Sequence, residues 1–146
     1  MKNVYLRIAT LLLLFTNCIY STTGQTHKGN VFLTSQADIN AFGQLNYKEV
    51  TGGLTIGTIS VSDIYDLSPL LSIETIGNGL SISHNDSLIS LYGLNNLTTV
   101  IGDVHIFSNK NLETLYGLES LMVIKDHTSR DRVRHFKIID NKALVD

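Results

Sequence analysis

The stretch from Thr75 to Val100, TIGNGLSISHNDSLISLYGLNNLTTV, decides the fold, because a second copy, TVIGDVHIFSNKNLETLYGLESLMVI, follows from Thr99 to Ile124. The two copies align without a gap, and matched residues are 24 positions apart. The matched pairs are Leu80 with Val104, Ile82 with Ile106, Asn85 with Asn109, Leu88 with Leu112, Leu91 with Leu115, Tyr92 with Tyr116, Gly93 with Gly117, Leu94 with Leu118, Leu97 with Leu121, and Val100 with Ile124. A fixed period of this length is typical of repeat proteins, in which each repeat buries its apolar side against its neighbours.

Two less regular copies flank this pair. On the N-terminal side, Leu54 and Ile56 match their counterparts at a separation of 26, so this copy contains two extra residues. On the C-terminal side, four residues match the second copy at a separation of 32, namely Phe136, Ile138, Asn141 and Leu144. Eight residues are therefore inserted before this last copy, which we expect to be incomplete.

The spacing inside a copy indicates the kind of repeat. Leu80 and Ile82 flank Ser81, which is the two-residue period of a strand. From Leu88 to Val100 apolar residues recur every three positions, and an α-helix would carry such a series around its surface. We therefore expect a mainly β fold, a parallel β-helix or leucine-rich-repeat-like solenoid with one short strand and tight bends in each coil of about 24 residues.

Asparagine and glycine recur at fixed places in the copies. Asn85, Asn109 and Asn141 each follow a strand, and an amide can satisfy backbone groups there and bond to the next asparagine. We expect them to form an inward structural ladder. Gly93 and Gly117 are expected to permit bends that a side chain would obstruct.

The N-terminal residues have the pattern of a secretory signal peptide. Lys2 and Arg7 precede an apolar run at 8–15 that is too short to cross a bilayer, so the pattern predicts a cleaved signal at 1–24 and no membrane-spanning segment in the mature chain. Cys18, the one cysteine of the sequence, lies in that segment. The large asparagine before it argues against lipid attachment there.

The next segment predicts a short helix. Ser35 and Asp38 suit a helix N-cap and its first turn, and Gly43 suits the end, so a helix from about Gln36 to Phe42 is expected to cover the first coil. This gives an N-terminal segment with a capping helix at 25–49 and a repeat domain at 50–146. The predicted C-terminal end has no such cover, which favours either a fragment of a longer protein or self-association through this open end.

Ligand-binding candidates lie on the outward side of the predicted strands. One outward column consists of Thr55, Ser81, His105 and Lys137, and a second consists of Gly57, Ser83, Phe107 and Ile139. We single out His105, Phe107 and Lys137, because an aromatic ring beside polar groups suits a sugar or peptide. The inserted segment 125–135 adds Arg130, Arg132 and Arg134, which suit carboxylates or sulfates. The alternative is that Phe107 and Ile139 cover each other and that the loop is merely solvated.

Other functions find little support in the sequence. A formal net charge of -2 over 146 residues argues against nucleic acid as a partner. Asp86 aligns with Lys110 and Asp103 with Gly79, so the acids do not stack into a paired-carboxylate site. His127 lies eight residues from His135 without further ligands. We therefore expect no catalytic site, no metal and no cofactor.

The run I-x-x-x-L-x-I-x-x-N-x-x-L-x-x-L-x-G-L-x-x-L, present from Ile76 to Leu97 and from Val100 to Leu121, resembles the repeats of the receptor L domain family and of related secreted, leucine-rich-repeat-like proteins of bacteria. The resemblance covers about 50–144 and implies a right-handed parallel β-helix that presents a surface to proteins or sugars. Receptor L domains usually have disulfide-bonded ends, which the predicted mature chain lacks, so the resemblance implies nothing about hormone binding.

These observations predict a non-catalytic binding or adhesion module that is secreted, periplasmic or held at the cell surface. Its expected partner is a protein or carbohydrate that the sequence does not identify. A structural or assembly segment of a longer surface protein is the alternative, and a glycan-cleaving β-helix enzyme is a weaker one.

Overall fold

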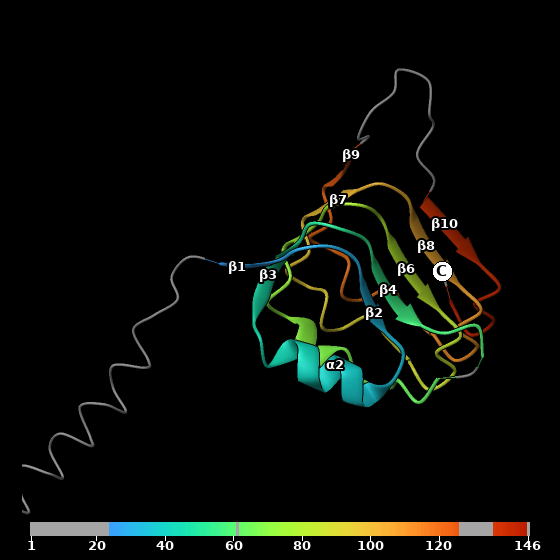
Figure 1. The fold of residues 1–146 in the computed structure, drawn as a ribbon. Helices are drawn as coiled ribbons and strands as arrows, with labels where there is room; N and C mark the ends of the chain where they lie inside the picture. The colour runs from blue at the N-terminus through green and yellow to red at the C-terminus, as the bar shows by residue number, and fades with distance from the viewer. Residues whose placement is uncertain (1–23, 61, 126–135, 146) are drawn as a thin grey trace, which may run out of the picture.

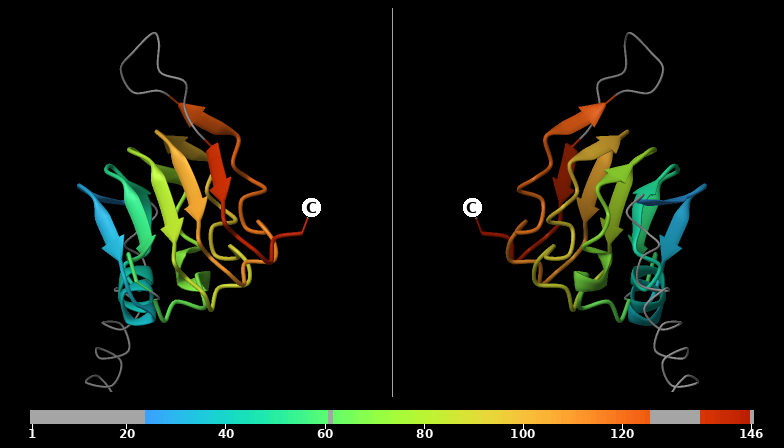
Figure 2. Two further views of the ribbon diagram at one scale, coloured as in Figure 1. Left: turned by 90° about the vertical axis from the view of Figure 1, so that its right-hand side faces the viewer. Right: turned by 90° about the vertical axis from the view of Figure 1, so that its left-hand side faces the viewer.

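The computed structural model describes residues 24–60, 62–125 and 136–145, which form two parallel sheets and one α-helix (Figure 1). Sheet A contains β1 (Gln25–His27), β3 (Tyr47–Val50), β5 (Thr75–Ile76), β7 (Thr99–Ile101) and β9 (Val123–Lys125), in that order. Sheet B contains β2 (Val31–Leu33), β4 (Leu54–Gly57), β6 (Leu80–Ser83), β8 (Val104–Phe107) and β10 (Phe136–Ile139). The chain enters the two sheets alternately, and Figure 2 shows the strands of sheet B side by side.

The expected mainly β solenoid, a parallel β-helix or leucine-rich-repeat-like coil, is wrong. The fold is α/β, with two open parallel sheets and a helix, and neither sheet curls or closes on itself. The physical reason is a second short strand in each copy, which builds sheet A as a separate open sheet beside sheet B. Between β6 and β7 the leucines spaced by three form the tight bends that were expected. Leu94 N donates to Leu91 O at 3.1 Å and Leu97 N donates to Leu94 O at 2.9 Å. The three-residue spacing therefore marks leucines that are buried in turns and not paired in a strand.

The alignment of the copies is confirmed as the strand register of sheet B. Leu80 pairs with Leu54 on one side and with Val104 on the other, at the separations of 26 and 24. Ile138 pairs with Ile106 across the separation of 32. Insertions between strands have therefore left the pairing unchanged.

Sheet A was missed, because we expected a single strand in each copy. Val100 pairs with Ile76 and with Ile124, so the last member of each three-residue series lies in a strand. These strands are only two to four residues long, and short strands flanked by leucines give no alternating pattern.

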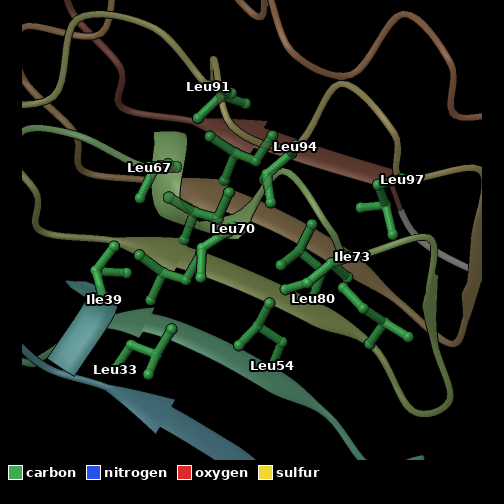
Figure 3. Close-up of a cluster of buried hydrophobic side chains, with 14 of the residues drawn as sticks. Leu33, Ile39, Leu54, Leu67, Leu70, Ile73, Leu80, Leu91, Leu94 and Leu97 are labelled. Carbon is green, nitrogen blue, oxygen red and sulfur yellow. The ribbon is translucent and has the colours of Figure 1, made fainter. Parts of the chain in front are cut away.

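The apolar core fills the space between the sheets and the turns. Leu91, Leu94 and Leu97 are buried together with the inward residues of β4, β6 and β8 (Figure 3). Their counterparts one repeat later are only partly buried: Leu115, Leu118 and Leu121. The core therefore loses its cover toward β9 and β10.

Two buried asparagines, Asn85 and Asn109, and the partly buried Asn141 link the repeats. Asn85 Nδ2 donates to Asn109 Oδ1 at 3.0 Å, and Asn109 Nδ2 donates to Asn141 Oδ1 at 3.1 Å. The same amides donate to strand carbonyls, for example Asn109 Nδ2 to Ile82 O at 3.0 Å. Ser62, which the sequence did not suggest, ends the row by donating its hydroxyl to Asn85 Oδ1 at 2.6 Å. We call these four residues the polar ladder.

Gly93 and Gly117 lie at points of close approach between repeats. Both have positive φ angles, +118° and +120°, and a Cβ on either would lie 2.0 Å from a carbonyl oxygen of the preceding repeat. Their expected role as bends agrees with this geometry, because any other side chain would force the repeats apart.

Helix α2 (Gln36–Gly43) lies at the β2 end of the sheets, close to the predicted bounds. Ser35 and Asp38 form a capping box, and Ile39 is fully buried in the core beside Leu33 (Figure 3). The helix packs against the 3-10 helix η1 (Ser68–Leu70).

Several expectations concern residues that the structure does not describe. The signal peptide at 1–24 with Cys18 falls almost wholly outside the described residues, as do Arg130, Arg132 and Arg134. The domain bounds stay predictions. Within the described ranges, no helix has the length and apolar character needed to cross a membrane.

The polar ladder predicts that Asn109→Ala lowers the free energy of unfolding by about 2–4 kcal/mol, because it leaves buried donors and acceptors without partners. Urea unfolding measures the loss. Asn111→Ala is the matched control, because Asn111 is exposed and its amide donates to Asp86 O at 2.8 Å, so a cost below about 1 kcal/mol is expected. Equal costs for the two variants would contradict the ladder's importance.

The capping box predicts a pH-dependent effect of Asp38→Ala. Hydrogen bonds from the Thr34 backbone and hydroxyl and from Ser35 hold the pKa of Asp38 below its usual 3.8. The stabilisation by the carboxylate is therefore complete above the usual pKa and disappears as the pH falls through the lowered one. At pH 7 the variant should be about 1 kcal/mol less stable than the wild type. This difference should shrink at about pH 2, and a difference independent of pH would refute the assignment.

Candidate ligand-binding groove

The outward residues of sheet B form a row that crosses the strands. Phe32 is in register with Thr55, Thr55 with Ser81, Ser81 with His105, and His105 with Lys137. Four of these were expected in one outward column, and that column is present. Phe32 extends it onto β2 and was missed, because no copy of the repeat was recognised before residue 50.

A groove of about 380 Å³ is hollowed into the middle of this row. Its lining comes from β4, β6, β8 and the turns that precede them: Gly53, Leu54, Thr55, Asn78, Gly79, Leu80, Ser81, Gly102, Asp103 and His105. We call it the strand groove. Its walls present hydroxyls, an amide, a carboxylate and an imidazole, which together offer both donors and acceptors.

Gly53 and Gly102 shape the floor of the strand groove. A Cβ on Gly53 would lie 2.7 Å from Asn78 O, and one on Gly102 would lie 2.7 Å from Gly79 N. Side chains at these positions would therefore push the turns apart, and their absence leaves peptide groups at the floor. The sequence signal is the glycine that precedes β4 and β6, which our interpretation of the outward columns did not use.

His105 lines the groove and has one ring nitrogen without a hydrogen-bond partner among the described residues. That nitrogen, Nε2, is buried. Leaving such a nitrogen unpaired costs about 1–3 kcal/mol.

The second expected column is only half correct. Ser83 is buried, and Gly57 is also buried, because a Cβ there would meet Ser83 O at 1.9 Å and the Asn85 amide at 2.8 Å. Phe107 is half-buried, and its ring packs edge-on against His84 with centroids 5.5 Å apart. It lies outside the lining of the strand groove.

The structure brings together only part of the predicted site. His105 and Lys137 are cross-strand neighbours, and Phe107 lies two residues along the same strand as His105 and pairs with Ile139. The three arginines lie outside the described residues, so their relation to the groove stays a prediction. Sequence reasoning missed Asn78 and Asp103, because they precede the strands and repeat imperfectly.

A second, apolar hollow lies where the core loses its cover. About 680 Å³ in volume, it is lined by Thr114, Leu115, Tyr116, Leu118, Glu119, Leu121, Met122 and Phe136. Met122 is 80% exposed, and Tyr116 stacks on Tyr92 with centroids 6.0 Å apart, so that its ring borders the hollow. We call this the end groove.

The acids of the described chain do not gather into a reactive pair at these grooves. Asp86 lies 2.6 Å from Lys110 Nζ, whose hydrogen bond lowers the pKa of the carboxyl. Asp103 is the one carboxylate in the lining of the strand groove. Among the described residues, no three histidine, cysteine, aspartate or glutamate side chains cluster in a way that could hold a metal ion.

Comparison with known proteins adds nothing to this picture, since no family model, no curated protein and no solved structure matches the chain. The resemblance to the receptor L domain family therefore stays a hypothesis based on the repeat residues alone.

Proposed function

We propose that this chain is a non-catalytic binding module that takes up an uncharged polar ligand in the strand groove. The observation that carries the proposal is the concave polar lining across β4, β6 and β8, formed by side chains and exposed peptide groups. Rigid strands position these groups, and a preformed site loses little entropy on binding.

The charge of the groove supports a neutral ligand. Its lining contains no lysine or arginine, and Asp103 and His105 are its titratable residues. Anionic polymers such as nucleic acids need several cations, which this lining does not offer. A protein or carbohydrate that presents hydroxyl and amide groups fits better.

A binding role without catalysis is favoured over a glycan-cleaving enzyme for a similar reason. Glycoside hydrolysis commonly uses two carboxyl groups on opposite sides of the bond, and the strand groove has a single one. The export predicted from residues 1–24 would place such a module in the periplasm, at the cell surface or outside the cell.

Filling the strand groove tests the proposal. Ser81→Trp should abolish binding to every ligand that wild-type protein captures from arrays of neutral oligosaccharides and peptides, because the indole occupies the groove. Ser87→Trp is the matched control, since Ser87 is exposed and lies outside the lining. Circular dichroism and thermal unfolding verify folding of both. Retained binding by a folded Ser81→Trp variant would sink the proposal.

Self-association through the end groove is a second candidate function. Its lining is mainly apolar, and Phe136 and Ile139 are exposed on β10, whose outer edge pairs with no described strand. Helix α2 occupies the opposite end of the sheets, so two copies would meet through their identical end grooves. Such a two-fold contact would cover apolar surface and offer partners to the free strand edges.

The mass in solution tests this second candidate. Wild-type protein should form a dimer in light scattering, and Met122→Asp should shift it to the monomer by placing a charge in the end groove. Ile59→Asp is the control, because Ile59 is 97% exposed and lies far along the sequence from the end groove. A wild-type protein that is monomeric at all concentrations would exclude the dimer.

A further inference from the structure

We infer that the ligand of the strand groove is an extended, uncharged glycan that lies across the strands of sheet B, with one sugar ring stacked on Phe32. This inference rests on the proposed binding function and names the ligand class. It depends on the direction of the outward row, on its chemistry and on the exposure of Phe32.

The direction of the row favours a linear polymer that crosses the strands. Phe32 and the groove residues Thr55, Ser81 and His105 stand on four adjacent parallel strands in register, and Lys137 follows on β10, outside the groove lining. Neighbouring strands are about 4.8 Å apart, so the row spans roughly 14 Å. The spacing of the strands is close to the length of one pyranose unit, so successive sugars could meet successive strands in an equivalent way.

A peptide would use this surface less well. An extended peptide gains most of its affinity by pairing with a free strand edge. The strands that line the groove, β4, β6 and β8, have partners on both sides, so their backbone hydrogen bonds in the ladder are already made. What remains available is the outward face, where side chains and turn peptides project.

The chemistry of the lining matches sugar hydroxyls. Thr55 and Ser81 offer hydroxyls that both donate and accept, Asn78 offers an amide, and the floor at the glycines offers peptide groups. His105 adds an imidazole to the same lining. Each hydroxyl of a sugar also donates and accepts, so one ring can pair with several of these groups at once.

Phe32 supplies the apolar contact that a sugar ring needs. It is 66% exposed on the outward face of β2, beside Thr55 at the edge of the groove. Exposing a phenyl ring to water is unfavourable, and the C–H face of a pyranose can cover it. The next residue in the row, Thr55, is polar, so the phenyl ring of Phe32 lies at the β2 end of a row of polar side chains.

The experiment measures binding by isothermal titration calorimetry with cellulose, chitin and xylan oligosaccharides of two to six units as probes. Affinity for at least one series should rise with length and level off at about four rings, the number of strands crossed. Phe32→Ala should weaken the four-ring probe roughly 5–10-fold. Tyr65→Ala is the matched control, because Tyr65 is 61% exposed and lies outside the row, and it should bind as the wild type does.

Each other result counts against a defined part of the argument. Affinity that is independent of length overturns the extended glycan, and so does a Phe32→Ala variant that binds like the wild type. In either case, loss of binding in the Ser81→Trp variant still identifies the groove as the binding site. If none of the three oligosaccharide series binds at millimolar concentrations, the glycan inference is wrong. If the protein then captures peptides, and Ser81→Trp abolishes that capture, the ligand of the groove is a peptide. Glycan binding that survives Ser81→Trp overturns the groove itself, and the proposed function with it.

Discussion

The hydrogen bonds between Asn85, Asn109 and Asn141 hold successive repeats in alignment. Each amide bridges the end of one strand of sheet B to the next repeat, so the repeats cannot slip against each other without leaving buried polar groups unpaired. The residue before each asparagine, His84, Ser108 or Asp140, has a positive φ angle that turns the chain inward to deliver the amide. The register of sheet B, and with it the row of outward residues, follows from this arrangement.

The sequence predicted those parts of the fold in which the same type of side chain recurs in every repeat. The pairing of Leu80 with Val104 and the place of Asn109 could be read from spacing alone, because burial demands the same residue type in each repeat. The second sheet could not, since strands as short as β5 and β7, of two and three residues, leave no alternating pattern. The helix α2 was predictable because capping is a local property of a few residues.

Sequence reasoning missed most of the candidate site for a related reason. Ser62 lies 23 residues before Asn85, at neither of the separations of 24 and 26 found in the repeats, so no fixed spacing reveals that it ends the ladder. The floor of the strand groove consists of backbone at Gly53 and Gly102, and an absent side chain leaves a weak signal in a sequence. Phe32 was overlooked because β2 precedes the recognisable copies. His105 was found because its outward position follows from the strand period.

The two grooves differ in the physical cause of their openness. The strand groove is hollow because the glycines in the turns have no side chains to fill it, so it is a property of the repeats themselves. The end groove is hollow because Leu115, Leu118 and Leu121 have no following described repeat to cover them. Polar recognition and apolar association would therefore use different surfaces of the same chain and need not exclude each other.

Strand register is kept while the length of the connecting segments varies. Pairing of Leu54 with Leu80 spans 26 residues and pairing of Ile106 with Ile138 spans 32, yet the sheet continues in step. Ile59, almost wholly exposed in the longer connection after β4, lies at such a variable point. Grafting a foreign peptide or a fluorescent label there would thus leave the scaffold intact, which makes this fold a natural carrier for displayed sequences.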